Sequence, residues 1–346
     1  MLYAQLKDKY EKSSSGNSGL TIISRLNRPK PTIVFDTYWK FATERQNIFY
    51  KRSNKEPQPW TDDEILMLHK FTNAYRASDR TSQYLIRHVI YRGDLPDSTA
   101  EVFFRIILFK LFNKIETWKL FEATLGRITY SDYSFETYDE ILTGALSSNQ
   151  TIYSAAYIMP SGITTFGHQA KHRNNLKLLE KMMHEDLPHK LATIASLENS
   201  FNMLLNYPTI GQFLAYQFAI DVNYSEITNF SEMEFVMAGP GAKNGIRKCF
   251  SDFGDFSETD IIKFVTDIQE SEFARLDLNF KFLRERPLQL IDCQNLFCEV
   301  DKYSRVKHPE IEGIVGRTRI KQKFLAKTED LNYWYPPKWG INDILT

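Results

Sequence analysis

The chain has 346 residues, of which 42% are hydrophobic and 25% charged, a composition typical of a folded protein with a substantial core. Its 43 basic residues balance its 43 acidic residues, so a surface that binds nucleic acid along its whole extent is not expected. No apolar run reaches the length of a membrane span, and the first residues lack the apolar core of a signal peptide, which together favour a cytoplasmic protein. The 3 cysteines are too few for a disulfide framework or a four-thiolate cluster, and we expect no metal and no cofactor.

The first part of the chain predicts a flexible start followed by helices. Residues 1–20 include a stretch rich in glycine and serine, so we expect this segment to be flexible. Apolar residues recur at helical spacing over 36–52, and Thr61 followed by acidic residues predicts the start of another helix. Polar side chains at spacings of three or four then predict a stripe along a single helix: Asn73, Arg76, Arg80, Gln83 and Arg87.

Helical patterns continue through the rest of the chain. Residues 100–122 indicate one strongly apolar helix that ends before Gly126, within which Arg105, Asn113 and Glu116 need polar partners. Further helices are predicted over residues 172–183, 188–205, 209–222 and 258–270. Strand-like alternation is scarce and no internal repeat is found, so the predicted fold class is all-α.

A glycine-rich segment is the strongest local motif. Gly239, Gly241 and Gly245 surround Pro240 and Lys243, and a second helix is predicted over 246–250. Glycines beside a proline let the backbone turn sharply and present its N–H groups to an anion. The sequence therefore predicts a hairpin over 239–245 that binds a DNA phosphate.

Charged residues near the C-terminus are candidates for catalysis and for DNA binding. Asp292 lies between Ile291 and Cys293, where a buried carboxylate must either be paired or take part in chemistry; the structural alternative is that it caps a helix. Between 302 and 327 the basic residues outnumber the acidic ones, and they are Lys302, Arg305, Lys307, Arg317, Arg319, Lys321, Lys323 and Lys327. Such a block either follows a phosphate backbone or forms a solvated helix face.

Two further groups of polar residues are ambiguous. The segment 206–224 combines an apolar body with amide and carboxylate side chains, namely Gln212, Gln217, Asp221 and Asn223. Such groups can read the edge of a base, or they can satisfy helix ends. His168 and His172 have the spacing of two metal ligands on a helix, but no third ligand is evident.

The segment from Met237 to Gly245 resembles the hairpin of helix-hairpin-helix DNA glycosylases, in which glycines beside a proline precede a basic residue. In members that also cleave the backbone, a lysine near the hairpin forms a Schiff base. The resemblance makes Lys243 a candidate nucleophile, or else a phosphate contact. Residues 290–297 resemble the segment that holds the family's catalytic aspartate, with Asp292 in its place. The separation from Lys243 exceeds the family's spacing, and a helix inserted around 260–270 would account for the excess.

Longer stretches resemble the helical domain of 5-hydroxymethyl-deoxyuridine DNA kinases, and they are residues 71–85, 103–118 and 292–303. That domain also occurs alone in bacterial proteins, is related to thymine-hypermodification enzymes and is more distantly related to DNA glycosylases. The resemblance implies a two-lobed helical bundle over residues 21–346, with a helix-hairpin-helix near 230–250. No Gly-x-x-x-x-Gly-Lys-Ser/Thr loop is found in the sequence, so phosphoryl transfer is not expected.

The resemblance also implies which residues form the site. Asp292 would stabilise the positive charge that develops on the sugar as a glycosidic bond breaks. Glu299, two helical turns further along the same face, is its rival, whereas Asp301 would face the opposite side. The expected DNA-binding residues are Gly239, Gly241, Lys243, Lys302 and Arg305. The expected base pocket contains Asn73, Arg76, Arg80, Gln83, Gln217 and Asp221; alternatively, its arginines form ion pairs with Asp79 or Glu116.

The function implied by the resemblance is that of a DNA glycosylase. It would flip a C5-modified, hydroxymethyl-derived pyrimidine, including glycosylated forms, out of double-stranded DNA and excise it, as a defence against phages with modified DNA. The alternative is a hypermodification transferase that replaces an activated group on the methylene carbon of 5-hydroxymethyluracil and leaves the glycosidic bond intact. A third interpretation is a DNA-binding module without catalysis.

Overall fold

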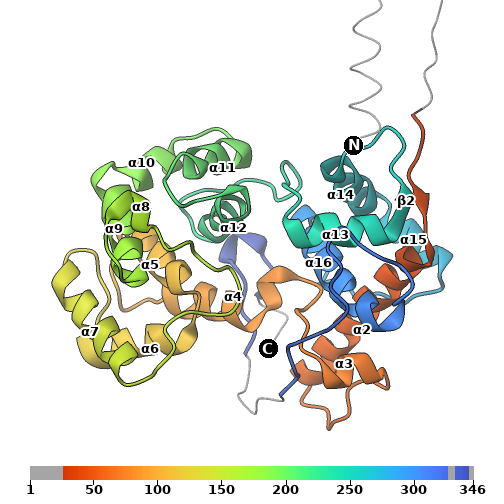
Figure 1. Ribbon diagram of the computed structural model, residues 1–346, viewed down its shortest axis with the longest axis horizontal. Coiled ribbons are helices and arrows are strands. Elements are labelled where there is room, and N and C mark those ends of the chain that lie inside the picture. The colour runs from red at the N-terminus through yellow and green to blue at the C-terminus, as the bar shows by residue number, and fades with distance from the viewer. Residues whose placement is uncertain (1–25, 326–331, 343–346) are drawn as a thin grey trace, which may run out of the picture. The chain divides into compact units, whose positions relative to one another are not determined.

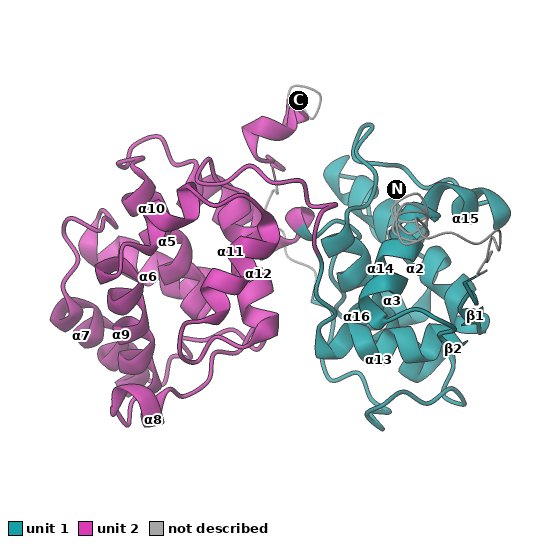
Figure 2. Ribbon diagram, turned by 90° about the horizontal axis from the view of Figure 1, so that it is seen from above, with its two compact units in different colours: residues 1–76, 236–330 teal, residues 77–235, 331–346 magenta. Residues whose placement is uncertain are grey.

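The computed structural model describes residues 26–325 and 332–342, which form two compact units (Figure 1). Unit 1 comprises residues 1–76 and 236–330, and unit 2 comprises residues 77–235 and 331–346 (Figure 2). The chain therefore leaves unit 1, builds most of unit 2, returns to complete unit 1 and ends in unit 2. The segment predicted to be flexible, residues 1–20, lies outside the described residues.

Unit 1 is organised around one buried helix. Its elements are β1 (Lys30–Pro31), α2 (Ile33–Ser53), α3 (Glu64–Leu68), α13 (Pro240–Cys249), β2 (Phe250–Asp252), α14 (Glu258–Asp267), α15 (Gln269–Arg275) and α16 (Leu290–Lys307). Helix α16 packs against α2, α3, α13 and α14, and the two short strands pair antiparallel. The Tyr38 ring of α2 lies 4.7 Å from the Phe297 ring of α16, and its hydroxyl donates to the Cys293 carbonyl at 3.1 Å.

Helix α2 shows how local sequence sets an element of unit 1. Thr32 caps it by accepting a hydrogen bond from the Val34 N–H at 3.1 Å. Lys51 and Arg52 occupy its last turn, where the helix dipole favours positive charge. The predicted helix over 36–52 is confirmed, with slightly wider bounds. Helix α3 begins later than predicted, because Asp63 rather than Thr61 accepts from the free N–H groups of its first turn.

Unit 2 is built around the apolar helix α5. Its elements are α4 (Arg80–Tyr84), η2 (Leu85–Ile90), α5 (Thr99–Phe112), α6 (Ile115–Leu125), α7 (Phe135–Ser147), α8 (Ile163–Phe166), α9 (Lys171–His184), α10 (Leu187–Ala192), α11 (Leu197–Leu205), α12 (Gln212–Asn223) and η3 (Pro337–Trp339). Helix α5 packs against η2, α6, α9, α10 and α12, and every residue from Glu101 to Phe112 is buried. The all-α prediction is confirmed by the described residues, since their strands are confined to one two-stranded sheet.

Several predicted helices are shorter than expected. The helix predicted over 100–122 is two helices, α5 and α6, because Asn113 adopts a left-handed conformation with φ of 48° and ends α5. The helix predicted over 188–205 is likewise two helices, α10 and α11. The helix predicted over 258–270 is α14 followed by α15. The predicted end before Gly126 is confirmed, since this residue caps α6 with φ of 74°.

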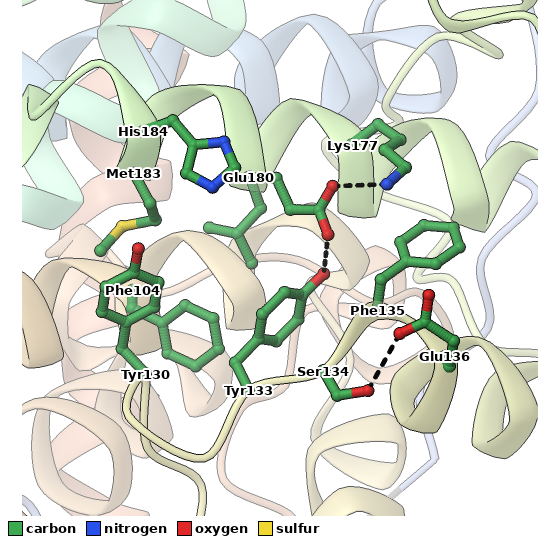
Figure 3. Close-up of a pocket in the computed structure, with 11 residues that line it drawn as sticks. Phe104, Tyr130, Tyr133, Ser134, Phe135, Glu136, Lys177, Glu180, Met183 and His184 are labelled. Atoms are coloured by element: carbon green, nitrogen blue, oxygen red, sulfur yellow. Dashed lines mark hydrogen bonds and ion pairs between the residues drawn. The ribbon is translucent and has the colours of Figure 1, made fainter.

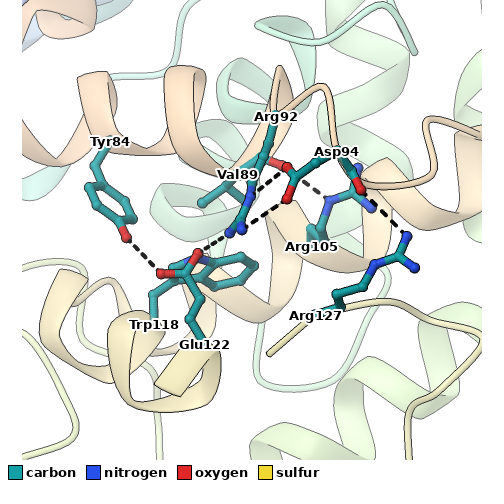
Figure 4. A network of polar contacts seen from close by, with 8 residues as sticks. All are labelled: Tyr84, Val89, Arg92, Asp94, Arg105, Trp118, Glu122 and Arg127. Atoms are coloured by element: carbon teal, nitrogen blue, oxygen red, sulfur yellow. Dashed lines mark hydrogen bonds and ion pairs between the residues drawn. The ribbon is translucent and has the colours of Figure 1, made fainter. Parts of the chain in front are cut away.

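A polar network in unit 2 joins side chains and backbone groups of η2, α5 and α6 (Figure 4). Glu122 of α6 accepts from Tyr84 (3.3 Å), from the Trp118 indole (3.0 Å) and from Arg92. Arg105, which the sequence left in need of a partner, donates to the Val89 carbonyl at 3.1 Å and lies 3.6 Å from Glu101. These contacts offset the desolvation of charges on an otherwise apolar helix.

Among the described residues, no helix combines the length and hydropathy needed to cross a bilayer. The longest apolar helix, α5, has only 14 residues.

Candidate functional site

A backbone segment of unit 1, residues 71–76, lies along α16 and is held by two carboxylates of that helix. The Thr72 N–H donates to Glu299 Oε2 at 3.1 Å, and the Arg76 N–H donates to Asp292 Oδ1 at 2.7 Å. Asp292 and Glu299 are seven residues apart and therefore project from one face of α16. The prediction that they share a face is confirmed.

Asp292 is also part of the start of α16. Gln289 is the N-cap residue, and Asp292 is the third residue of a capping box in which its Oδ2 accepts from the Gln289 N–H at 2.9 Å. Asp292 is 4% exposed, and each of its oxygens accepts from a backbone amide. Its carboxylate therefore fixes the first turn of α16 and the conformation of Arg76, a role close to the helix-capping alternative.

Helix α2 also contacts segment 71–76. Arg45 donates to the Thr72 carbonyl at 2.8 Å and to Asn73 Oδ1 at 3.0 Å, which orients the Asn73 side chain. Sequence periodicity placed Arg45 on a helix but gave no sign that its guanidinium reaches another segment. The contact joins residues 28 apart in sequence.

The turn before α16 brings two further arginines into the same part of unit 1. The Tyr75 hydroxyl donates to the Arg286 carbonyl at 2.6 Å and accepts from the Leu283 N–H at 3.3 Å. Arg284 sits in the left-handed region with φ of 57°, and both arginine side chains are half-buried. Burial raises the pKa of Tyr75 well above its usual value, and the nearby Asp292 charge raises it further. Segment 71–76 and residues 283–292 therefore form one polar cluster.

The glycine-rich segment is not a hairpin, and that prediction is wrong. Helix α13 begins at Pro240 with Gly239 as its N-cap, so Gly241 and Gly245 lie inside the helix, and residues 224–239 before it contain no helix. A side chain at Gly245 would collide with the Phe297 carbonyl, and one at Gly241 would lie 2.9 Å from Cys298 Sγ. The glycines therefore allow close packing of α13 on α16.

The contacts of α13 fall further along α16 than Asp292. Asn244 donates to Asp301 Oδ1, and Lys248 Nζ lies 3.3 Å from the same atom. Asp301 is nine residues beyond Asp292, which corresponds to about 13 Å along a helix axis. Lys243 is exposed on the first turn of α13, and no contact described here joins it to Asp292.

Lys302 and Arg305, predicted to bind DNA, have acidic partners on α16. Lys302 forms a 2.7 Å ion pair with Glu299 and lies 4.5 Å from the centre of the Phe71 ring. Arg305 pairs with Asp301 at 2.5 Å. Their side chains are only 15% and 11% exposed, so both cations are largely committed to contacts within unit 1.

The remaining predicted base-pocket residues belong to unit 2. A single helix carrying the stripe from Asn73 to Arg87 is not formed, because α4 starts only at Arg80 and a π-helical segment begins at Leu85. Gln83 donates to the Ala77 carbonyl at 2.7 Å and accepts from the Trp334 N–H at 2.8 Å. The Arg80 guanidinium lies 3.9 Å from Glu116, as the ion-pair alternative predicted.

Gln217 and Asp221 lie on the buried face of α12. Asp221 forms a 3.1 Å ion pair with Lys110 of α5, and both side chains are at most 4% exposed. Lys110 also donates to Asn113 Oδ1 at 2.8 Å and lies 4.7 Å from the Tyr157 ring centre. Asn223 binds the Phe230 backbone through both its amide nitrogen and its oxygen, as a helix-end role predicts.

Two cavities lie away from the predicted catalytic and base-pocket residues. In unit 2 a cavity of about 460 Å³ lies between the segment around Tyr133 and helix α9 (Figure 3). The Tyr133 hydroxyl points at Glu180, 3.4 Å away, and Glu180 also pairs with Lys177 at 2.7 Å. In unit 1 a cavity of about 750 Å³ is lined by polar residues that include Asp63 and Tyr303.

The histidine pair does not form a metal site with its neighbours. His172 bonds to Asp139 at 2.8 Å, and burial lowers the pKa of His172 although Asp139 opposes this shift. Within residues 26–325 and 332–342, no group of three or more histidine, cysteine or acidic side chains has the arrangement of a metal site.

The fold is that of an all-α domain with a buried carboxylate, Asp292, at the start of a core helix. Residues 32–313 match the family described as the helical domain of 5-hmdU DNA kinase, and the chain belongs to this family. It is 26% identical over 332 residues to the 5-hmdU DNA kinase of Bacillus phage SP10. The match covers 90% of this chain and 52% of the phage protein, so the chain spans about half the length of that relative.

The predicted family is thereby confirmed. The name of the phage protein describes a 5-hmdU DNA kinase and not a glycosylase. No solved structure matches the chain significantly.

Proposed function

We propose that this chain binds double-stranded DNA that carries a 5-hydroxymethylated pyrimidine and takes part in modifying that base. The observation that supports the proposal is the family match over residues 32–313, together with the phage relative named for its action on 5-hmdU in DNA. The alternative of base modification, with the glycosidic bond left intact, is therefore preferred to base excision.

The contacts of Asp292 favour the same choice. A glycosylase needs a carboxylate oxygen directed at the sugar or at the attacking water. Both oxygens of Asp292 already accept backbone amides, at 2.7 and 2.9 Å. In the proposed function Asp292 is a positioning residue that holds the Arg76 backbone against the start of α16.

The proposal is tested with two duplexes that are identical except for one 5-hydroxymethyl-deoxyuridine in place of thymidine. We expect tighter binding of the modified duplex, and, when a cell extract supplies donor groups, a heavier nucleoside after digestion and mass spectrometry. Release of a free base with an abasic site would support the glycosylase instead, and with it a role in defence against modified phages. Equal binding of both duplexes, with no change of mass, would contradict the proposal.

Variants at Asp292 separate its two roles. Asp292→Asn removes the acceptor for one of two backbone amides, and we expect the free energy of unfolding to fall by about 1–2 kcal/mol. Preference for the modified duplex should persist at a temperature where the variant is folded. A folded variant of unchanged stability that has lost base release would instead identify Asp292 as catalytic.

A further inference from the structure

The segment that follows α16 carries four cations at alternate positions: Arg317, Arg319, Lys321 and Lys323. All four side chains are exposed. Within residues 26–325 and 332–342, no acidic side chain pairs with any of them. They differ in this respect from Lys302 and Arg305 in the preceding helix.

The backbone of this segment is extended. Residues 316–325 contain no turn or bend, and Lys323 forms an antiparallel bridge with His69. The Gln322 carbonyl accepts from the Lys70 N–H, and the Phe324 N–H donates to the Leu68 carbonyl, each at 3.1 Å. In an extended chain successive side chains point to opposite faces, so the four cations share one face.

The opposite face of the segment is attached to unit 1. Ile320 is 7% exposed, and the Phe324 ring lies 6.5 Å from the Trp60 ring. The Arg319 carbonyl accepts from Arg305 at 3.3 Å, and the Val315 N–H donates to Asn244 at 2.9 Å. The cations therefore project from a backbone that is held in place at several points along its length.

The spacing of these cations suits a nucleic-acid backbone. Alternate residues of an extended chain are about 6.6 Å apart, which is close to the distance between consecutive phosphates of one strand. No aromatic side chain shares the outer face, so the surface is suited to phosphates rather than to stacking on bases. Two of the cations are arginines, which can bind phosphate oxygens through two hydrogen bonds.

We propose that Arg317, Arg319, Lys321 and Lys323 form a phosphate-binding strip that contacts one strand of duplex DNA without regard to sequence. That the partner is DNA rests on the proposed function. The strip supplies the backbone contacts that the sequence assigned to Lys302 and Arg305, while Arg305 positions the strip by bonding its backbone.

The test replaces all four cations of the strip by glutamine in the full chain. The matched control replaces Lys40, Lys119, Lys190 and Lys281 by glutamine, which removes the same charge from exposed positions elsewhere. Binding to the modified and unmodified duplexes is measured between 50 and 300 mM salt, and thermal unfolding shows that both variants fold. We expect the strip variant to bind both duplexes about a hundredfold more weakly, with a salt slope smaller by roughly 3 to 4, and the control variant to bind nearly as tightly as the unaltered chain.

The outcomes of this test distinguish a failure of the strip proposal from a failure of the proposed function. Equal weakening by both variants, an unchanged salt slope in the strip variant, or no duplex binding by the unaltered chain would each overturn the strip. If the unaltered chain does not distinguish the two duplexes but the strip variant loses affinity for both, the strip stands and the proposed function fails.

Discussion

Unit 1 contains two sets of cations that are close in sequence and differ in what they contact. On α16, Lys302 and Arg305 follow Glu299 and Asp301 at the three- and four-residue spacings of a helix, and each forms an ion pair. In the extended segment the cations alternate with uncharged residues, and no acidic side chain described here pairs with them. Local charge density therefore does not identify cations without acidic partners, because the backbone conformation decides which charges find partners.

Replacement of Asp301, the acidic partner of Arg305, should have the largest effect on stability. Asp301 is buried with Lys248, Asn244 and Arg305 around it. Asp301→Asn leaves the buried Lys248 ammonium without a carboxylate, so we expect a loss of about 3 kcal/mol or more in the free energy of unfolding, measured with denaturant. Asp62→Asn, at an exposed position of unit 1, is the control and should change it by less than about 0.5 kcal/mol. Similar stabilities for the two variants would mean that the buried pair contributes nothing.

Two glycines provide a matched pair of variants, because Gly245 lies within α13 and Gly316 immediately precedes the strip. Gly245→Ala places a methyl group against the Phe297 carbonyl and must separate α13 from α16, at a cost of about 2–3 kcal/mol. Gly316→Ala is the matched change next to the strip, where nothing lies within 4 Å of the added carbon, and it should be close to neutral. Thermal unfolding of both variants measures the difference. If Gly245→Ala instead left stability intact and weakened DNA binding alone, the glycine segment would be a phosphate site after all.

Single cation variants compare the two sets directly. Arg319→Gln should lower the slope of log affinity against log salt by about 0.9 without changing stability. Lys302→Gln removes a paired, largely buried cation, so it should leave the slope nearly unchanged and cost about 0.5–1 kcal/mol of stability. Salt titrations of DNA binding with both variants provide the measurement, and a larger change of slope for Lys302→Gln would reverse the assignment.

In unit 2, Lys338 is a buried cation whose partners are backbone carbonyls instead of carboxylates. Its ammonium donates to the carbonyls of Ser225 and Thr228, each at 2.6 Å, and burial lowers the pKa of Lys338 to about 8. Because its pKa is higher in the unfolded chain, the unfolded state binds more protons between about pH 8 and 10.4, and stability should rise with pH in that window. Lys338→Met should flatten this rise in unfolding experiments from pH 7.5 to 10. An unchanged pH dependence would show that Lys338 titrates as in water.

Much of the fold could be predicted from periodicity. Helices α2, α9 and α12 were found close to their observed bounds because each has a long, regular apolar pattern. The break between α5 and α6 was missed because Asn113 ends α5 through a backbone conformation that apolar spacing does not reveal. Glycines four residues apart in α13 permit close helix packing as readily as a turn, and only the tertiary structure distinguishes the two.

Less of the candidate site could be predicted. The sequence found Asp292 and placed Glu299 on the same helix face, since helical spacing fixes that relation. It gave no sign that their oxygens accept the amides of Thr72 and Arg76, more than 200 residues earlier in the chain. The excess of cations near the C-terminus was visible, but the residues chosen from it, Lys302 and Arg305, are those whose helix supplies acidic partners.

The central claim, recognition of a hydroxymethylated base in DNA, is tested most directly by competition at a fixed salt concentration. The unaltered chain is bound to a labelled duplex with one 5-hydroxymethyl-deoxyuridine and displaced by unlabelled duplexes with or without the hydroxymethyl group. We predict that the modified competitor displaces the label at an at least tenfold lower concentration, a difference of about 1.4 kcal/mol. Equal displacement by the two competitors would contradict the claim.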